Sequence, residues 1–210
     1  MKLSSLLSRF SEPETLKMAK LGRELRAQGV DVIDLSLGEP DFDTPDHIKT
    51  SAKKAVDDNY SHYTPVPGYL DAREAVCVKL KRDNNLDYKP ENIVLSTGAK
   101  QSLANIILAT VDHGDEVIIP APFWVTYSEL VKIAGGVPVI LTTKMENKYK
   151  ITGAELEAAI TPKTRVFLFS SPCNPSGSVY SYDELKSLAD VFAKHPDIFI
   201  ISDEIYEYIN

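Results

Sequence analysis

The sequence contains little of what would mark several classes of protein. Its 210 residues include only two cysteines, Cys77 and Cys173, which are too few for a disulfide framework and favour a reducing cytoplasm. No apolar run approaches the roughly 20 residues of a membrane-spanning helix, and Arg9 and several serines interrupt the N-terminal leucines, so no secretory signal is expected. The net charge of −7 argues against a general nucleic-acid binder.

Two glycine-rich motifs are also absent. Neither G-x-G-x-x-G nor G-x-x-x-x-G-K-[ST] follows a predicted strand, which disfavours a dinucleotide site and a P-loop.

The composition, with 43% hydrophobic and 25% charged residues, is ordinary for a globular protein of one or two domains. The chain stops at Asn210 directly after an apolar strand, whereas a domain normally ends beyond its last packed element. The sequence therefore predicts a piece of a longer protein.

Predicted helices and strands alternate through most of the chain. Helices are expected over residues 14–28, 46–57, 70–82, 99–110, 123–133, 154–160 and 182–193. Strands are expected over residues 32–35, 93–96, 116–119, 137–140, 165–170 and 197–202. This alternation predicts an α/β fold, a mostly parallel sheet with helices on both faces. In such sheets, ligands bind beyond the carboxyl ends of the strands.

Two strand ends carry residues suited to a flat, anionic ligand. Gly98 opens the predicted helix after strand 93–96, and free amides at a helix start favour a phosphate, although glycine at such a turn is common. Trp124, the only tryptophan, follows strand 116–119. It is either a core aromatic or a flat face that stacks on a planar ligand.

Two further strand ends carry an amide and an acid. Asn174–Pro175 lies in a proline-rich turn after strand 165–170 and is either a cis bond or a simple Asx turn. Asp203 follows the last strand, where a carboxylate is costly unless it is paired. Its partner is either a protonated heterocycle nitrogen or a neighbouring amide or basic residue. Together the four ends suit a flat, phosphorylated, basic heterocycle.

The sequence resembles the class I/II aminotransferases, the aspartate-aminotransferase-like group of fold-type I pyridoxal phosphate (PLP) enzymes. The resemblance runs along essentially the whole chain. Its specific segments are Ser36–Pro45, His62–Gly68, Pro120–Trp124, Ser171–Gly177 and Ser202–Tyr206. The implied fold is the large domain of a PLP-dependent transferase over residues 46–210, left incomplete. Residues 1–45 would form an arm, a helix and a substrate loop that belong partly to the small domain.

The resemblance implies a role in PLP binding for eight residues. Asp203 would pair with the pyridine nitrogen, which makes the ring an electron sink. Asn174 and Tyr206 would hydrogen-bond the phenolic oxygen, and Trp124 would stack on the ring. The phosphate would be held by the amides of Gly98, Ala99 and Lys100 and by Tyr63 from a neighbouring subunit, so that a homodimer shares its active sites. No metal site is expected.

The resemblance also implies an amino acid and a 2-oxo acid as substrates, with an aspartate-like amino acid favoured. Gly38, Asn174 and Trp124 would contact the substrate, and Lys100 is a candidate for the distal carboxylate of a dicarboxylic acid. The family's Schiff-base lysine and carboxylate-binding arginine lie beyond residue 210, so the chain by itself is expected to be inactive. Two alternatives stay open: a β-lyase or decarboxylase of the same fold, and a non-catalytic binding protein.

Overall fold

The computed structural model describes residues 3–8, 14–35, 38 and 42–209. The chain divides into two compact units, one made of Glu14–Ser96 and the other of Thr97–Asn210 with Met1–Pro13. In the second, a short 3-10 helix, η1 (Ser5–Ser8), lies near the N-terminus. No helix among the described residues has the length and apolarity needed to cross a bilayer. The expected domain boundary at residue 45 stays a prediction.

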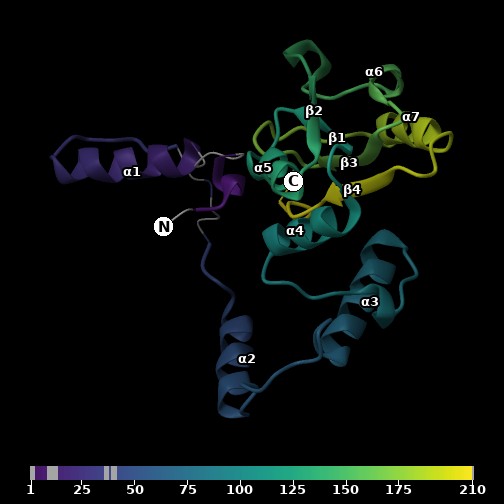
Figure 1. Cartoon of the computed structure of the whole chain (residues 1–210). Coiled ribbons are helices and arrows are strands. Elements are labelled where there is room, and N and C mark those ends of the chain that lie inside the picture. The colour runs from purple at the N-terminus through teal and green to yellow at the C-terminus, as the bar shows by residue number, and fades with distance from the viewer. Residues whose placement is uncertain (1–2, 9–13, 36–37, 39–41, 210) are drawn as a thin grey trace. The chain divides into compact units, whose positions relative to one another are not determined.

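The unit Glu14–Ser96 is helical. It contains α1 (Glu14–Ala27), α2 (Asp46–Asp57), α3 (Leu70–Asn84) and the 3-10 helix η2 (Pro90–Asn92) (Figure 1). Arg73 of α3 donates hydrogen bonds to the carbonyl oxygens of Gly68 and Pro90, at 3.2 and 2.8 Å. This guanidinium therefore joins the turn before α3 to the segment that follows it.

Two expected strands in this unit are wrong. Residues 32–35 and 93–96 have no strand structure and pair with no neighbour in the described part of the chain. Ile33 and Leu35 are 87% and 91% exposed, and Val94 is 63% exposed. A strand requires a partner for its backbone N–H and C=O groups, which a local apolar run does not supply.

The unit Thr97–Asn210 contains a four-stranded parallel sheet, as expected. Its strands are β1 (Glu116–Ala121), β2 (Val137–Thr142), β3 (Thr164–Ser170) and β4 (Phe199–Asp203), in the order β2-β1-β3-β4. Each neighbouring pair is parallel. The carboxyl ends of β1, β3 and β4 therefore lie at the same edge of the sheet.

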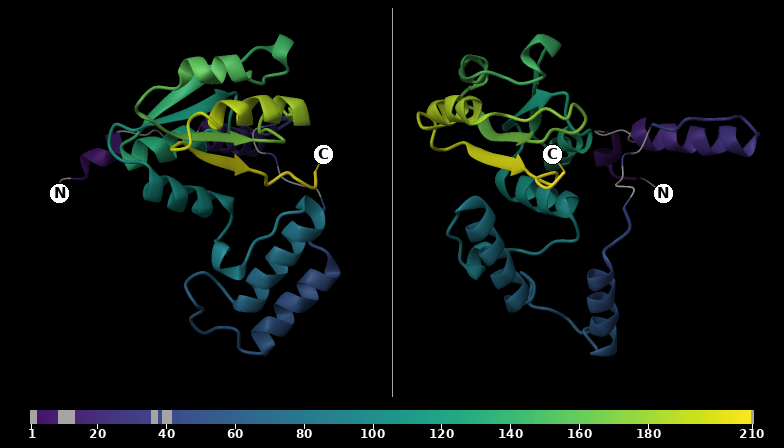
Figure 2. Two further views of the ribbon diagram at one scale, coloured as in Figure 1. Left: turned by 90° about the vertical axis from the view of Figure 1, so that its right-hand side faces the viewer. Right: turned by 180° about the vertical axis from the view of Figure 1, so that it is seen from behind.

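Helices cover both faces of this sheet, which confirms the predicted fold class (Figure 2). The helices are α4 (Ala99–Thr110), α5 (Thr126–Ala134), α6 (Gly153–Ala159) and α7 (Tyr182–Phe192), and a 3-10 helix, η3 (Met145–Asn147), follows β2. Helix α5 begins at Thr126 instead of residue 123. Pro122, Phe123 and Trp124 thus belong to the loop after β1, at the carboxyl end of the sheet.

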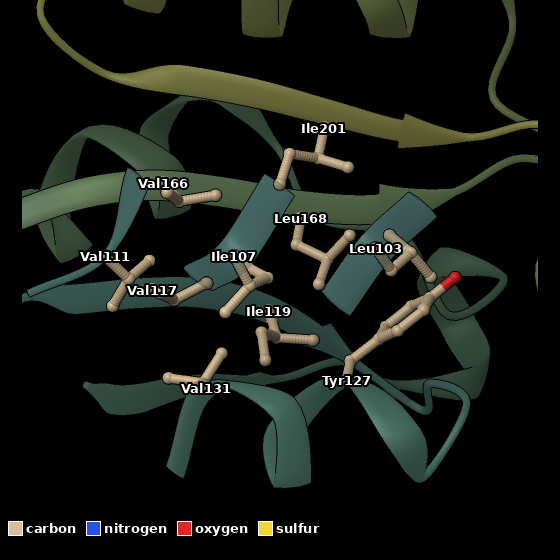
Figure 3. Packing of buried hydrophobic residues seen from close by; sticks show 10 residues of the cluster. All are labelled: Leu103, Ile107, Val111, Val117, Ile119, Tyr127, Val131, Val166, Leu168 and Ile201. Atoms are coloured by element: carbon tan, nitrogen blue, oxygen red, sulfur yellow. The ribbon is translucent and has the colours of Figure 1, made fainter. Parts of the chain in front are cut away.

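Alternate side chains of β3 enter two separate cores. Val166 and Leu168 pack with residues of α4 and α5, whereas Phe167 and Phe169 pack with residues of α6 and α7. Figure 3 shows the first core, in which the ring of Tyr127 lies among aliphatic side chains and its hydroxyl reaches the margin of the cluster. Strand β3 is therefore buried on both faces, as its continuous apolar run predicted.

The helices α6 and α7 both begin with capping boxes. Thr152 and Glu155 cap α6, and Ser181 and Glu184 cap α7, with each side chain accepting a hydrogen bond from the other's backbone N–H. Glu184 also accepts a hydrogen bond of 2.6 Å from the ammonium of Lys150. The Lys150 hydrogen bond is the main cause that lowers the pKa of Glu184 from 4.5 to about 2.

The Lys150→Met substitution should raise the pKa of Glu184 towards its ordinary value. Because the folded pKa is the lower one, ionised Glu184 contributes stability at neutral pH, and this contribution is lost as the pH falls from 4.5 to about 2. Titration of the Glu184 carboxyl in the intact protein by carbon-13 NMR measures the change. Lys144→Met, outside this contact, is the control; an unchanged titration in Lys150→Met contradicts the assigned cause.

Candidate functional site

Polar groups gather at the carboxyl edge of the sheet. Asp203 ends β4 beside Ser170, the last residue of β3, with which it is in register. Ala121 ends β1 on the other side of β3. The loops that follow these strands contain Trp124, Asn174 and Tyr206, so residues far apart in the sequence meet at one edge.

Asp203 is half-buried and is held by neutral donors. The hydroxyl of Tyr127 donates to Oδ2 at 2.7 Å, and the backbone N–H of Ile205 donates to Oδ1 at 3.3 Å. No ion pair joins Asp203 to a basic residue in the described part of the chain. The carboxylate thus has hydrogen-bond partners but no compensating positive charge within those residues.

Tyr127 is a buried residue, 1% exposed, in the first core. Burial is the main cause that raises the pKa of Tyr127 far above its usual range, followed by the hydrogen bond to Asp203 and the negative charge of that group. The phenol is therefore protonated at any physiological pH and remains a donor. Its ring stacks on Phe123, at 6.4 Å between centroids, and meets Trp124 edge-on at 5.8 Å.

Trp124 is half-buried, packed against the first core on one side. The Lys100 ammonium lies over its ring, 4.9 Å from the centroid, which is a favourable cation–π distance. Lys100 itself is exposed, one residue into the first turn of α4. A continuous series of contacts thus leads from the start of α4 through Trp124 and Tyr127 to Asp203.

The start of α4 offers free amides. Gly98 is the N-cap residue with φ of +81°, a conformation that side chains rarely adopt. In the described part of the chain, the backbone N–H groups of Gly98, Ala99 and Lys100 donate no hydrogen bond. Unsatisfied N–H groups at the positive end of a twelve-residue helix form a suitable site for an anion.

The proline-rich turns meet at the same edge. Asn174 donates a hydrogen bond from Nδ2 to the hydroxyl of Tyr206 at 3.2 Å, and the Cys173 thiol donates to the Pro122 carbonyl at 3.3 Å. The Asn174–Pro175 bond is cis, one of the two alternatives that the sequence left open, and Ala121–Pro122 and Ser171–Pro172 are cis as well. The amide and the phenol assigned to one ligand atom are therefore direct neighbours.

Two expected site residues belong to the other compact unit. Tyr63 and Gly38 belong to the unit Glu14–Ser96, and both are exposed. Half of the segment Ser36–Pro45 around Gly38, namely residues 36–37 and 39–41, falls outside the described residues. Their expected roles stay predictions.

Tyr127 is not among the site residues expected from the sequence. One signal was available, since Tyr127 stands three residues after Trp124 at the start of a helix, where the two side chains can meet. Nothing in its own segment indicated the contact with Asp203, 76 positions later. No group of three His, Cys, Asp or Glu residues within the described ranges is arranged to hold a metal ion.

The arrangement suits a flat ligand with a phosphate and a protonated ring nitrogen. The helix start can bind the phosphate, Trp124 presents an aromatic face, and Asp203 presents an unneutralised carboxylate to a cation. A family model described as aminotransferase class I and II matches residues 30–209. The chain belongs to this family. The class I and II aminotransferases thus account for the resemblance seen in the sequence.

Individual aminotransferases are similar over nearly the whole chain. An aspartate/prephenate aminotransferase of Cereibacter sphaeroides is 47% identical over 99% of the chain, and an aspartate aminotransferase of Bacillus subtilis is 44% identical over 99%. The chain spans 52% of the length of each.

Solved aminotransferase structures match the whole fold. The aspartate aminotransferase of Rhizobium meliloti superposes with a TM-score of 0.96 at 40% identity, over 100% of this chain and 52% of that one. The Thermus thermophilus aspartate aminotransferase with maleate superposes with a TM-score of 0.94 at 40% identity. This match covers 99% of this chain and 54% of that one. The chain therefore spans about half the length of the relatives it matches.

The Gly98→Ala substitution should weaken the binding of a phosphorylated ligand to the intact protein, with PLP as the probe. An added Cβ meets nothing within 4 Å, so the cost is the backbone conformation, φ +81° and ψ 163°, on the order of 1–3 kcal/mol, which the loop can avoid by turning its amides away. Gly114→Ala is the matched control, since Gly114 has φ of +89°, equally open space, and lies before β1. Fluorescence titration with PLP measures the affinity of each variant. An equal loss of PLP affinity in Gly98→Ala and Gly114→Ala contradicts a phosphate site at Gly98.

Proposed function

We propose that the intact protein containing this chain is a PLP-dependent aminotransferase. It transfers an amino group between an amino acid and a 2-oxo acid such as 2-oxoglutarate. Membership of the family and the unneutralised carboxylate of Asp203, held at the carboxyl edge of the sheet, are the observations that support this proposal most. A basic ring nitrogen would supply the positive charge that this carboxylate lacks among the described residues.

The described residues fit PLP at three points. The amides of Gly98, Ala99 and Lys100 would bind the phosphate, the ring of Trp124 would lie against the pyridine, and Asp203 would keep the ring nitrogen protonated. Asn174 and Tyr206, 3.2 Å apart, would share the phenolic oxygen. When bound, PLP supplies an electron sink for the negative charge that develops at the substrate α-carbon.

Each residue has a defined task in this proposal. Asp203 would hold a proton on the ring nitrogen, and Trp124 would orient the ring and cover one of its faces. Asn174 would help to hold the substrate carboxylate. The covalent anchor and general base, a lysine in this family, and the carboxylate-binding arginine are to be supplied by the protein outside these 210 residues.

The favoured amino-acid substrate is a dicarboxylic one. Lys100 is exposed and its ammonium lies over the ring of Trp124, which supports a role in binding a second carboxylate. Support also comes from a relative, because the solved Thermus enzyme is a complex with maleate, a dicarboxylate. The relatives named for both aspartate and prephenate are consistent with an acidic substrate.

The proposed active form is a homodimer in the cytoplasm. Tyr63 is fully exposed within the chain, which leaves its hydroxyl available to the cofactor phosphate of a second subunit. Both cysteines, Cys77 and Cys173, are unpaired thiols, in keeping with a reducing compartment.

The Asp203→Ala substitution in the intact protein should lower the transamination rate by several orders of magnitude. Loss of a single preorganised donor costs about 10²–10³ in kcat, and loss of ring protonation removes a full charge interaction. Aspartate-dependent glutamate formation from 2-oxoglutarate is the assay, and thermal unfolding reports whether the fold is kept. Asp190→Ala, an exposed acid of α7, is the control; near-normal rates in Asp203→Ala would contradict the proposal.

The Lys100→Met substitution should raise the KM for aspartate by about tenfold, the value of one charge-assisted contact of about 1.4 kcal/mol. The KM for alanine should change little, because alanine has no distal carboxylate. Lys132→Met, at the far end of α5 and paired with Glu129, is the control. If Lys100→Met raises the KM for aspartate and the KM for alanine equally, Lys100 acts instead through the cofactor or through Trp124.

A further inference from the structure

Tyr127 joins the hydrophobic core to the one carboxylate of the site. Its ring packs in the first core, while its hydroxyl lies 2.7 Å from Oδ2 of Asp203. The same ring fixes Trp124 edge-on at 5.8 Å. Two of the groups assigned to the cofactor therefore touch a single residue that is itself hidden from solvent.

Tyr127 cannot contact a ligand directly, because it is only 1% exposed. The cavity beside it, lined also by Ser170, Cys173 and Tyr180, measures about 10 Å³. About 10–15 Å³ is the least that holds one water, so neither cofactor nor substrate fits there. Any influence of Tyr127 on the reaction thus passes through Asp203 or Trp124.

The hydrogen bond from Tyr127 leaves the Asp203 carboxylate able to accept further hydrogen bonds. A carboxylate has about four lone-pair sites, and the structure uses one on Oδ2 for Tyr127 and one on Oδ1 for Ile205. The Ile205 bond is the longer, at 3.3 Å, and comes from the loop that follows β4. Tyr127 therefore provides the shorter contact, and it does so from a buried position on α5.

We propose that Tyr127 is a positioning residue that fixes the Asp203 carboxylate in the orientation needed to receive a protonated ring nitrogen. The proposal rests on the proposed function for the identity of the ring. It adds that the carboxylate is oriented by a buried phenol and not by the ligand. Burial also raises the pKa of Tyr127, so this donor is not lost by titration at physiological pH.

The test compares two buried tyrosines in the intact protein. Tyr127→Phe removes the hydroxyl and keeps the ring in the core. Tyr180→Phe is the matched control: Tyr180 is 8% exposed and its hydroxyl accepts a hydrogen bond of 3.0 Å from the Ile151 N–H, in the second core. Both variants lose one buried hydroxyl, but only the first loses a contact with Asp203.

Tyr127→Phe should bind PLP about tenfold more weakly than the wild type, since hydrogen bonds to charged groups are the strong ones. It should also reduce the induced circular dichroism of the bound cofactor, which reports ring orientation. Tyr180→Phe should change neither. If Tyr127→Phe matches the wild type in both measurements, the inference is wrong and the proposed function is unaffected.

Two further measurements separate a positioning role from a loss of folding. In an Asp203→Ala background, Tyr127→Phe should have no added effect on PLP affinity, because Tyr127 acts through Asp203. In the cofactor-free protein, Tyr127→Phe should shift the infrared carboxylate stretch that Asp203→Ala removes. The inference is overturned if the losses of PLP affinity caused by Tyr127→Phe and Asp203→Ala add up in the double variant. It is also overturned if Tyr127→Phe leaves the infrared carboxylate band unshifted. A wild-type protein that binds no PLP overturns the proposed function, and the infrared band then decides on Tyr127 alone.

Discussion

The burial of β3 on both faces is the constraint on which the rest of this unit depends. Val166 and Leu168 point into one core, and Phe167 and Phe169 point into the other, all within 9% exposure. Between Val166 and Phe169 this strand cannot hold a charge, because neither face is in contact with water there; its charged residue, Arg165, lies next to the start of the strand and is exposed. Polar groups are restricted to the strand ends, and parallel pairing brings the carboxyl ends to the same edge.

Asp203 is stable at that edge without a cation from the described chain. Neutral donors satisfy part of its hydrogen-bonding capacity and leave its charge uncompensated. A lysine or arginine in the same place would stabilise the carboxylate and would also compete with a cationic ligand. Hydrogen bonds from a phenol and an amide therefore suit a binding site better than an ion pair does, since they orient the group and preserve its charge.

The sequence predicted the parts of this arrangement that depend on local pattern. The parallel sheet, its two covered faces and the three strand ends followed by Trp124, Asn174 and Asp203 follow from apolar runs and from the residues after them. The strands expected at 32–35 and 93–96 are wrong because an apolar run does not reveal whether a neighbour is available to pair. Tyr127 was missed because its segment is that of a core helix, and its one polar contact is made with a residue 76 positions away.

That long-range contact changes how the stability of the core relates to the site. Tyr127 shares the first core with Leu103 and Ile107 of α4, Val131 of α5 and Leu168 of β3. A close-packed core transmits a change in volume to its neighbours, since few voids exist to absorb it. A shift of Tyr127 by a few tenths of an ångström alters a hydrogen bond of 2.7 Å as well as the edge-on contact with Trp124. The orientation of the charged group at the surface of the sheet is therefore set by packing beneath it, and the loops contribute the groups that this packing aligns.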